Sequence, residues 1–328
     1  MRNETRRLLT SGLLVVIAGL GGWGQGAHAQ DKYPSRAIDI IVPFAPGGFT
    51  DLSARTTGAY LSKKWGVPVS VIDKPGARGI PQTQELYRAA PDGYTLLADN
   101  PSTNSILAAA MGKELPFNAL ERTFIGINTG TPYTLIVAPD SPYKSLAQLL
   151  ADAKKNPEKI SYTSQGATGS ADLFIRVLLK DTGVDVAKLQ PVMVSSGSAI
   201  VPMAAGGHVT MGLPSASSAH AAVQGNLVRA LVISSRDRDP DYPGVPTTVE
   251  LGYPVVMSWN GLSGPPNMPM HIVTAISRAL KESVEDPAFL ANLKKFGAIP
   301  FYHDSQGMKE YVRSEIEETA KLMAPGSK

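Results

Sequence analysis

The sequence predicts an α/β protein in which mainly parallel β-sheet is flanked by helices. Short β-rich runs alternate with segments of helical periodicity in the order β-α-β-α-β near the N-terminus, and the alternation returns in the middle of the chain. The 328 residues allow one large domain or two of medium size. Two α/β units are plausible, but neither composition nor an internal repeat marks a boundary between them.

The apolar run Ala37–Pro43 predicts the first strand, which is buried. A helix over 51–65 follows a glycine turn, because Leu52, Thr56 and Tyr60 recur near helical spacing. The same reasoning predicts further strands at 67–72, 94–98, 134–138, 159–164, 189–194, 228–234 and 258–264. It predicts further helices at 80–89, 106–111, 146–154, 170–180, 199–205, 272–285, 287–296 and 306–323.

The first 29 residues have the three parts of a secretory signal peptide. A basic start (Arg2, Arg6, Arg7) precedes an apolar stretch, and Ala27-His28-Ala29 offers a small-x-small cleavage site. The alternative is a membrane anchor, but the apolar stretch is shorter than the roughly 20 residues that a span needs. We therefore expect cleavage near Ala29 and a periplasmic mature protein.

Composition excludes several kinds of partner and site. Without residues 1–29 the chain has 28 basic and 27 acidic side chains, so charge gives no reason to expect nucleic acid as a partner. The chain has no cysteine, which excludes disulfides, thiolate nucleophiles and cysteine metal sites.

The segment Pro43–Asp51 lies between a predicted strand and a predicted helix. Its glycines let backbone approach a ligand closely, and free N–H groups at a helix start favour an anion. In the alternative, Thr50 or Asp51 caps the helix. Asp51 is expected to cap rather than to bind, because its charge would repel a carboxylate.

The segment Thr163–Ser170 is a second junction of this kind, with several hydroxyls, two glycines and no charge. It could surround a carboxylate with neutral donors, or it could be a capping turn in which Ser170 satisfies its own helix end. The segments 99–104 and 194–198 are similar junctions. Ligands of open α/β sheets bind beyond the carboxyl ends of the strands, so several of these junctions could face one cleft.

Enzyme motifs are missing from the sequence. It contains no G-x-S-x-G elbow, no Walker-type phosphate loop and no G-x-G-x-x-G after the first strand, and its histidines lack metal-ligand spacing. We predict no catalytic residue, no metal and no cofactor. Trp259 could line a cleft or pack in the core, and a secreted hydrolase stays as a remote alternative.

Three motifs resemble one family closely. They are Tyr33–Asp51 with Ala54-Arg55, Val71–Gly79 and Ala90–Leu97. These segments resemble the Bug-type substrate receptors of tripartite tricarboxylate transporters, and weaker similarity extends over essentially the whole mature chain.

The resemblance implies a two-domain fold like that of type II periplasmic binding proteins, with a ligand cleft between the domains. Domain 1 would comprise 30–135 and 253–328, and domain 2 would comprise 136–252. A small organic acid would be captured by flytrap closure and passed by a monomer to membrane permease subunits. A receptor that signals to a sensor protein is the alternative.

The sequence departs from the family pattern at 194–197 and at 211–215, where a basic residue and an acid are often found. An amino-acid ligand is therefore less expected, and the segment 99–101 also differs from the usual pattern. The predicted ligand-binding residues are Phe44, Ala45, Gly47, Gly48, Phe49, Thr50, Ser102, Ser164, Gly166, Thr168, Ser170 and Ser196.

Overall fold

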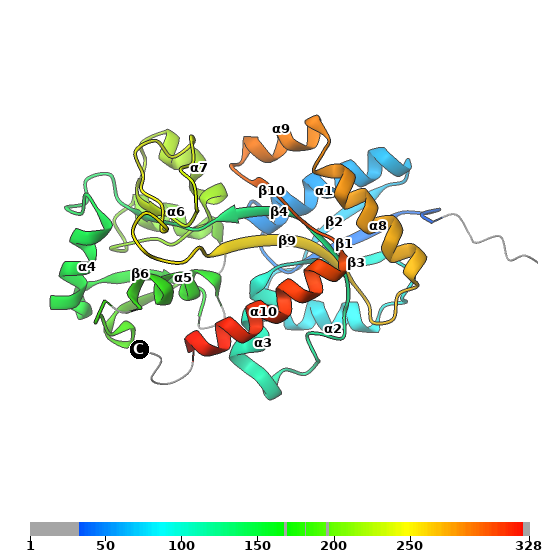
Figure 1. Cartoon of the computed structure of the whole chain (residues 1–328), viewed down its shortest axis with the longest axis horizontal. Helices are drawn as coiled ribbons and strands as arrows, with labels where there is room; N and C mark the ends of the chain where they lie inside the picture. The colour runs from blue at the N-terminus through cyan, green and yellow to red at the C-terminus, as the bar shows by residue number, and fades with distance from the viewer. Residues whose placement is uncertain (1–32, 167–168, 181, 195–196, 324–328) are drawn as a thin grey trace, which may run out of the picture. The chain divides into compact units, whose positions relative to one another are not determined.

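The computed structural model describes residues 33–166, 169–180, 182–194 and 197–323 (Figure 1). The predicted signal peptide, Thr168 and Ser196 lie outside these residues.

A six-stranded sheet forms the centre of what we call the first lobe, with strand order β10-β4-β9-β3-β1-β2. The strands are β1 (Ile38–Val42), β2 (Val69–Asp73), β3 (Thr95–Asp99), β4 (Thr123–Pro132), β9 (Met257–Gly264) and β10 (Ile299–His303). Strand β1 pairs in parallel with β2 and β3, whereas β9 runs antiparallel to β3 and β4, and β10 antiparallel to β4. The sheet is thus parallel on one side and antiparallel on the other.

Six helices belong to the first lobe among the described residues. They are α1 (Phe49–Trp65), α2 (Ile80–Arg88), α3 (Ser105–Met111), α8 (Met270–Ser283), α9 (Pro287–Lys295) and α10 (Ser305–Met323). The 3-10 turns η1 (Ala77–Gly79), η2 (Pro101–Thr103) and η3 (Gly112–Glu114) connect them. The C-terminal helix α10 packs on α3 and β4, so the end of the chain returns to its beginning (Figure 1).

The second lobe holds two short strand pairs. Strand β5 (Thr134–Val137) runs antiparallel to β8 (Arg229–Ile233), and β6 (Ser161–Ser164) runs parallel to β7 (Gln190–Met193). Its helices are α4 (Leu146–Lys155), α5 (Ser170–Leu179), α6 (Gly197–Ala205) and α7 (Ala216–Gln224), with the 3-10 turns η4 (Pro157–Lys159) and η5 (Val186–Lys188).

Each lobe has its own hydrophobic core. Ile40, Leu96 and Ile276 belong to one buried cluster in the first lobe, whereas Phe174 and Leu231 belong to another in the second. The chain crosses between the lobes at Tyr133, between β4 and β5, and returns before β9. Trp259 of β9 is fully buried among Phe124, Met308 and Val312, so it packs in the core.

Most predicted elements are present within a few residues, and the mixed α/β class is confirmed. Strands β4 and β10 and helix α7 were not predicted. β4 carries the buried polar residues Asn128, Thr129 and Thr131, so it has neither an apolar run nor an alternating pattern. Strand β10 contains Pro300 and lies at the sheet edge, where a proline is tolerated.

Candidate functional site

A cavity of about 60 Å³ lies between the two lobes, and it has room for a few water molecules. It is lined by Phe44, Ala45, Gly48, Phe49, Thr50, Asn100, Ser102, Tyr133, Gln165, Gly197, Ile200, Leu213, Ser215, Ser218 and Ser258. None of these described lining residues carries a charge at neutral pH, yet most offer a hydroxyl, an amide or a backbone N–H group. The cavity therefore suits an acceptor-rich ligand that is bound by neutral donors.

The loop after β1 brings the start of α1 to the cavity. Gly48 is the N-cap residue and makes no side-chain cap, so the N–H groups of the first turn have no acceptor from that residue. Gly47 has a φ of +84°, a conformation that favours glycine, and its N–H donates to Asp51 Oδ2 at 2.8 Å. The prediction that Thr50 or Asp51 caps the helix is wrong, because Gly48 is the N-cap residue and Asp51 is the third helical residue. Asp51 instead holds the preceding loop, and the Gly47 N–H is already engaged.

The corresponding loop of the second lobe is also held by an aspartate at the third position of a helix. Asp172 of α5 accepts hydrogen bonds from Ser164 Oγ at 2.6 Å and from the Gln165 N–H at 3.0 Å. Burial raises the pKa of Asp172, against the effect of these donors. The Ser164 hydroxyl is therefore used inside the loop, where it also accepts from the Gly166 N–H at 3.0 Å.

One hydrogen bond joins the lobes beside the cavity. The hydroxyl oxygens of Ser102 and Ser170 lie 2.8 Å apart, so η2 of the first lobe contacts the start of α5 in the second. Gly169, not Ser170, is the N-cap residue of α5, so the Ser170 hydroxyl does not cap its own helix.

The structure brings six of the twelve predicted residues to the cavity: Phe44, Ala45, Gly48, Phe49, Thr50 and Ser102. Gly47, Ser164, Gly166 and Ser170 lie in the neighbouring loops but do not line it, and Thr168 and Ser196 lie outside the described residues.

None of the predicted residues that line the cavity belongs to the second lobe, so the prediction missed that side of the lining. Ser215 and Ser218 lie at the start of α7, where the Ser215 hydroxyl accepts from the Ser218 N–H. A serine that precedes an alanine-rich run is a helix start signal, and it could have indicated this helix. Tyr133 is buried at the crossing between the lobes, and no local pattern marks it.

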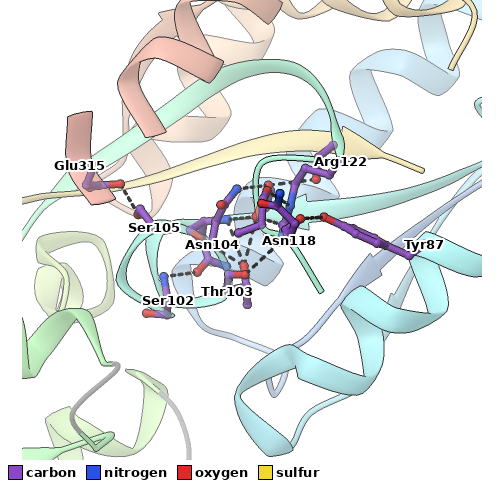
Figure 2. A network of polar contacts seen from close by, with 12 residues as sticks. Tyr87, Ser102, Thr103, Asn104, Ser105, Asn118, Arg122 and Glu315 are labelled. Atoms are coloured by element: carbon purple, nitrogen blue, oxygen red, sulfur yellow. Dashed lines mark hydrogen bonds and ion pairs between the residues drawn. The ribbon is translucent and has the colours of Figure 1, made fainter. Parts of the chain in front are cut away.

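A buried polar network lies beside the cavity residue Asn100, whose N–H donates to Asp99 Oδ1 at 3.1 Å. Thr103, Asn104 and Arg122 belong to this network (Figure 2). Asp99 and Arg122 form an ion pair at 2.8 Å, and both side chains are 0 % exposed. Asp99 also accepts from Asn104 at 2.8 Å and from Ser263 at 3.0 Å. Because Arg122 balances the Asp99 carboxylate, the network adds no net negative charge behind the cavity.

Glu315 of α10 lies at the other end of this region (Figure 2). Its Oε2 accepts hydrogen bonds from Ser105 Oγ and from Trp259 Nε1, the latter at 3.0 Å. The side chain is partly exposed, but the carboxyl group points inward, and burial raises its pKa to about 7.

Two negative findings apply to the described residues only. They contain no group of three or more histidine, aspartate or glutamate side chains that could hold a metal ion. They also contain no helix that combines the length and apolar character needed to cross a bilayer.

Comparison with known structures places the fold. A periplasmic transporter of known structure is 31% identical, with a TM-score of 0.82 over 88% of this chain and 97% of that one. MatC from Rhodopseudomonas palustris, solved with bound malate, is 25% identical, with a TM-score of 0.79 over 89% of this chain and 100% of that one. The periplasmic binding protein BugD is 26% identical with a TM-score of 0.78, over 88% and 97% of the two chains. The predicted periplasmic-binding-protein fold is thereby confirmed.

Curated relatives and a family model agree with the structures. A protein of the UPF0065 group from Bordetella pertussis is 31% identical over 97% of this chain and 95% of its own length. Protein BugT from the same organism is 29% identical over 98% and 97% of the two chains. The model of the tripartite tricarboxylate transporter family receptor matches residues 53–325, and the chain therefore belongs to this family of periplasmic solute-binding receptors.

Proposed function

We propose that this protein is a periplasmic receptor that captures a small carboxylated organic acid in the cavity between its lobes. The observation that carries the proposal is an uncharged cavity that combines the uncapped start of α1 with hydroxyl and amide donors from both lobes. Neutral donors bind an anion reversibly, as a carrier requires. The likeness to MatC, solved with malate, supports a carboxylate.

The proposed mechanism is domain closure around the acid. We assign 30–135 and 253–328 to domain 1 and 136–252 to domain 2, although Leu135, at the first boundary, packs in the hydrophobic core of the second lobe. Because both lobes line the cavity, a bound acid contacts both and stabilises the closed arrangement over the open one. The Ser102–Ser170 hydrogen bond is one contact that closure would make and opening would break.

The remaining parts of the proposal follow from the family. The chain would be exported, with cleavage of its leader near Ala29, and would deliver the acid as a monomer to permease subunits of a tripartite transporter. Family members are receptors, which favours binding and release of an unchanged ligand over catalysis.

A thermal-shift panel on the chain from Gln30 onward tests the proposal. The protein is unfolded and refolded to remove carried-over ligand, and is then heated with hydroxy acids, di- and tricarboxylates, aromatic acids, amino acids and sugars. An acid at about 100 times its Kd should stabilise the fold by about 2.7 kcal/mol and raise Tm by several degrees, and its amide analogue should not. Stabilisation by sugars alone, with no response to any acid, would contradict the proposal.

A further inference from the structure

We propose that Asn100 selects the ligand: its Nδ2 donates a hydrogen bond to an oxygen of the bound acid and so favours hydroxy, oxo and dicarboxylic acids over amino acids. The inference rests on the proposed function and adds the substrate class. It concerns a residue at the carboxyl end of β3, between the lining residues of the first lobe and the Asp99 network.

The orientation of the Asn100 amide follows from its neighbours. Its Oδ1 accepts the Ser102 N–H at 3.0 Å, as part of a capping box that also involves Thr103. Oxygen and nitrogen of an amide can be exchanged only if the partners allow it, and a backbone N–H cannot pair with an NH₂ group. The amide atom next to the Ser102 N–H is therefore Oδ1, and the other amide atom is Nδ2.

That nitrogen has no partner. Asn100 is only 3 % exposed, it lines the cavity, and Nδ2 has no hydrogen-bond acceptor in the structure. An unpaired buried amide costs free energy, so native proteins rarely keep one without a use. Because Nδ2 itself has almost no exposed surface, a ligand oxygen would satisfy it once the lobes and the cavity lining shift to admit the acid.

The rest of the cavity sets the class of ligand. An ammonium group is held best by a carboxylate, and none of the described lining residues is acidic. The lining offers only neutral acceptors, such as the Gln165 amide oxygen and the serine hydroxyls. The two nearby aspartates in the loops are engaged, Asp51 by the Gly47 N–H and Asp172 by Ser164 and Gln165. A hydroxyl, oxo or carboxylate oxygen can instead accept from Asn100.

The test exchanges one atom. Asn100→Asp keeps an oxygen for the Ser102 N–H, and aspartate is as good a helix cap as asparagine, but Nδ2 becomes an acceptor. Titration calorimetry compares malate with aspartate and lactate with alanine, since each pair exchanges a hydroxyl for an ammonium group. We expect the wild type to prefer the hydroxy acids, and the variant to bind them roughly 10- to 100-fold more weakly while its preference for them over the amino acids narrows or reverses.

A second variant separates loss of the donor from gain of a charge. Asn100→Ser retains a capping hydroxyl but removes the amide. It should therefore bind hydroxy acids more weakly and should not bind amino acids more tightly. If other acids of the thermal-shift panel bind instead of malate and lactate, both variants should bind those acids more weakly than the wild type does.

Three results would overturn the inference, and one of them also rejects the proposed function. Asn100 has no role in selection if both variants bind the acids with a Kd within threefold of the wild-type value. The same follows if the wild type binds amino acids as tightly as hydroxy acids. Either result leaves the receptor proposal standing. A wild type that binds no carboxylate rejects the proposed function itself, and the inference falls with it.

Discussion

Three carboxylates close to the cavity are engaged by other groups of the protein. Asp51, Asp99 and Asp172 all lie close to the cavity, and each carboxylate accepts hydrogen bonds from a loop or a network. The same groups that shape the loops carry the charge that an anionic ligand must tolerate. Cationic side chains outside the cavity, such as Arg122 beside Asp99, offset this negative charge, and the described cavity lining contains no cation.

Glu315 provides a pH prediction at this scale. Burial of its carboxyl group raises the pKa to about 7 from 4.5. The folded state therefore holds a proton to higher pH than the unfolded chain, and stability falls as pH rises from about 4.5 to about 7. We expect this group to lower the free energy of unfolding by up to about 3 kcal/mol between pH 4.5 and pH 8, measured by urea unfolding.

The Glu315→Gln variant should lose most of that pH dependence, because a neutral amide oxygen still accepts from Ser105 and Trp259. Glu317→Gln, which alters another exposed acid of α10, is the matched control and should retain it. An unchanged pH profile in Glu315→Gln would show that another group is responsible.

Residue chemistry was predictable where it is local. The glycine-rich run 43–51 and the polar residue Ser102 follow strands directly, and both reach the cavity. The free donor of Asn100 could not be foreseen, because it depends on the capping box that fixes its oxygen and on the Asp99 network behind it.

Among the elements, α1 is the one whose first turn would contact the proposed anionic ligand. Its first turn reaches the cavity, and its third residue, Asp51, holds the loop. Arg55, one turn later, lies 2.6 Å from Asp51 Oδ1 and 2.5 Å from Asp73 Oδ2. Arg55 of α1 therefore offsets the negative charge of Asp51 at the start of the same helix.

The Arg55→Met variant tests this compensation. Without the guanidinium, the Asp51 carboxylate is less screened, and acid binding should weaken by roughly two- to fivefold at low salt. The effect should shrink as NaCl is raised, because the interaction is electrostatic. Arg88→Met, which removes another exposed arginine of the first lobe, is the control; equal weakening in both variants at all salt concentrations would refute a local role.

Elements with a regular pattern were predicted and elements without one were not. The helix 51–65 has helical spacing and appears as α1. Strand β4 is buried with polar side chains that hydrogen-bond to helices packed on the sheet, as Asn128 does with Thr57 of α1 and Ser283 of α8. Such a strand is stabilised by its neighbours, so its own sequence carries little signal.

At the scale of the whole molecule, the two lobes meet at the cavity and at the two chain crossings. Tyr133 lies at one crossing and lines the cavity, so the proposed ligand site and the proposed hinge would share a residue. The alternation of strands and helices predicted the class, but the return of α10 to the first lobe depends on contacts far apart in the sequence. Only the family resemblance indicated it.

Calorimetry with a cavity-filling variant tests the central claim, that a carboxylate binds between the lobes. Gly48 lines the cavity at a φ of −82°, and a Cβ there would meet nothing closer than Ala45 O at 3.9 Å. Gly48→Val should therefore fold, with a Tm lower by a few degrees because valine is a poorer N-cap residue than glycine, while its side chain occupies space beside the start of α1. The account predicts one acid per wild-type chain and no detectable binding by the variant. Equal binding of the acid by both proteins would place the ligand elsewhere and contradict it.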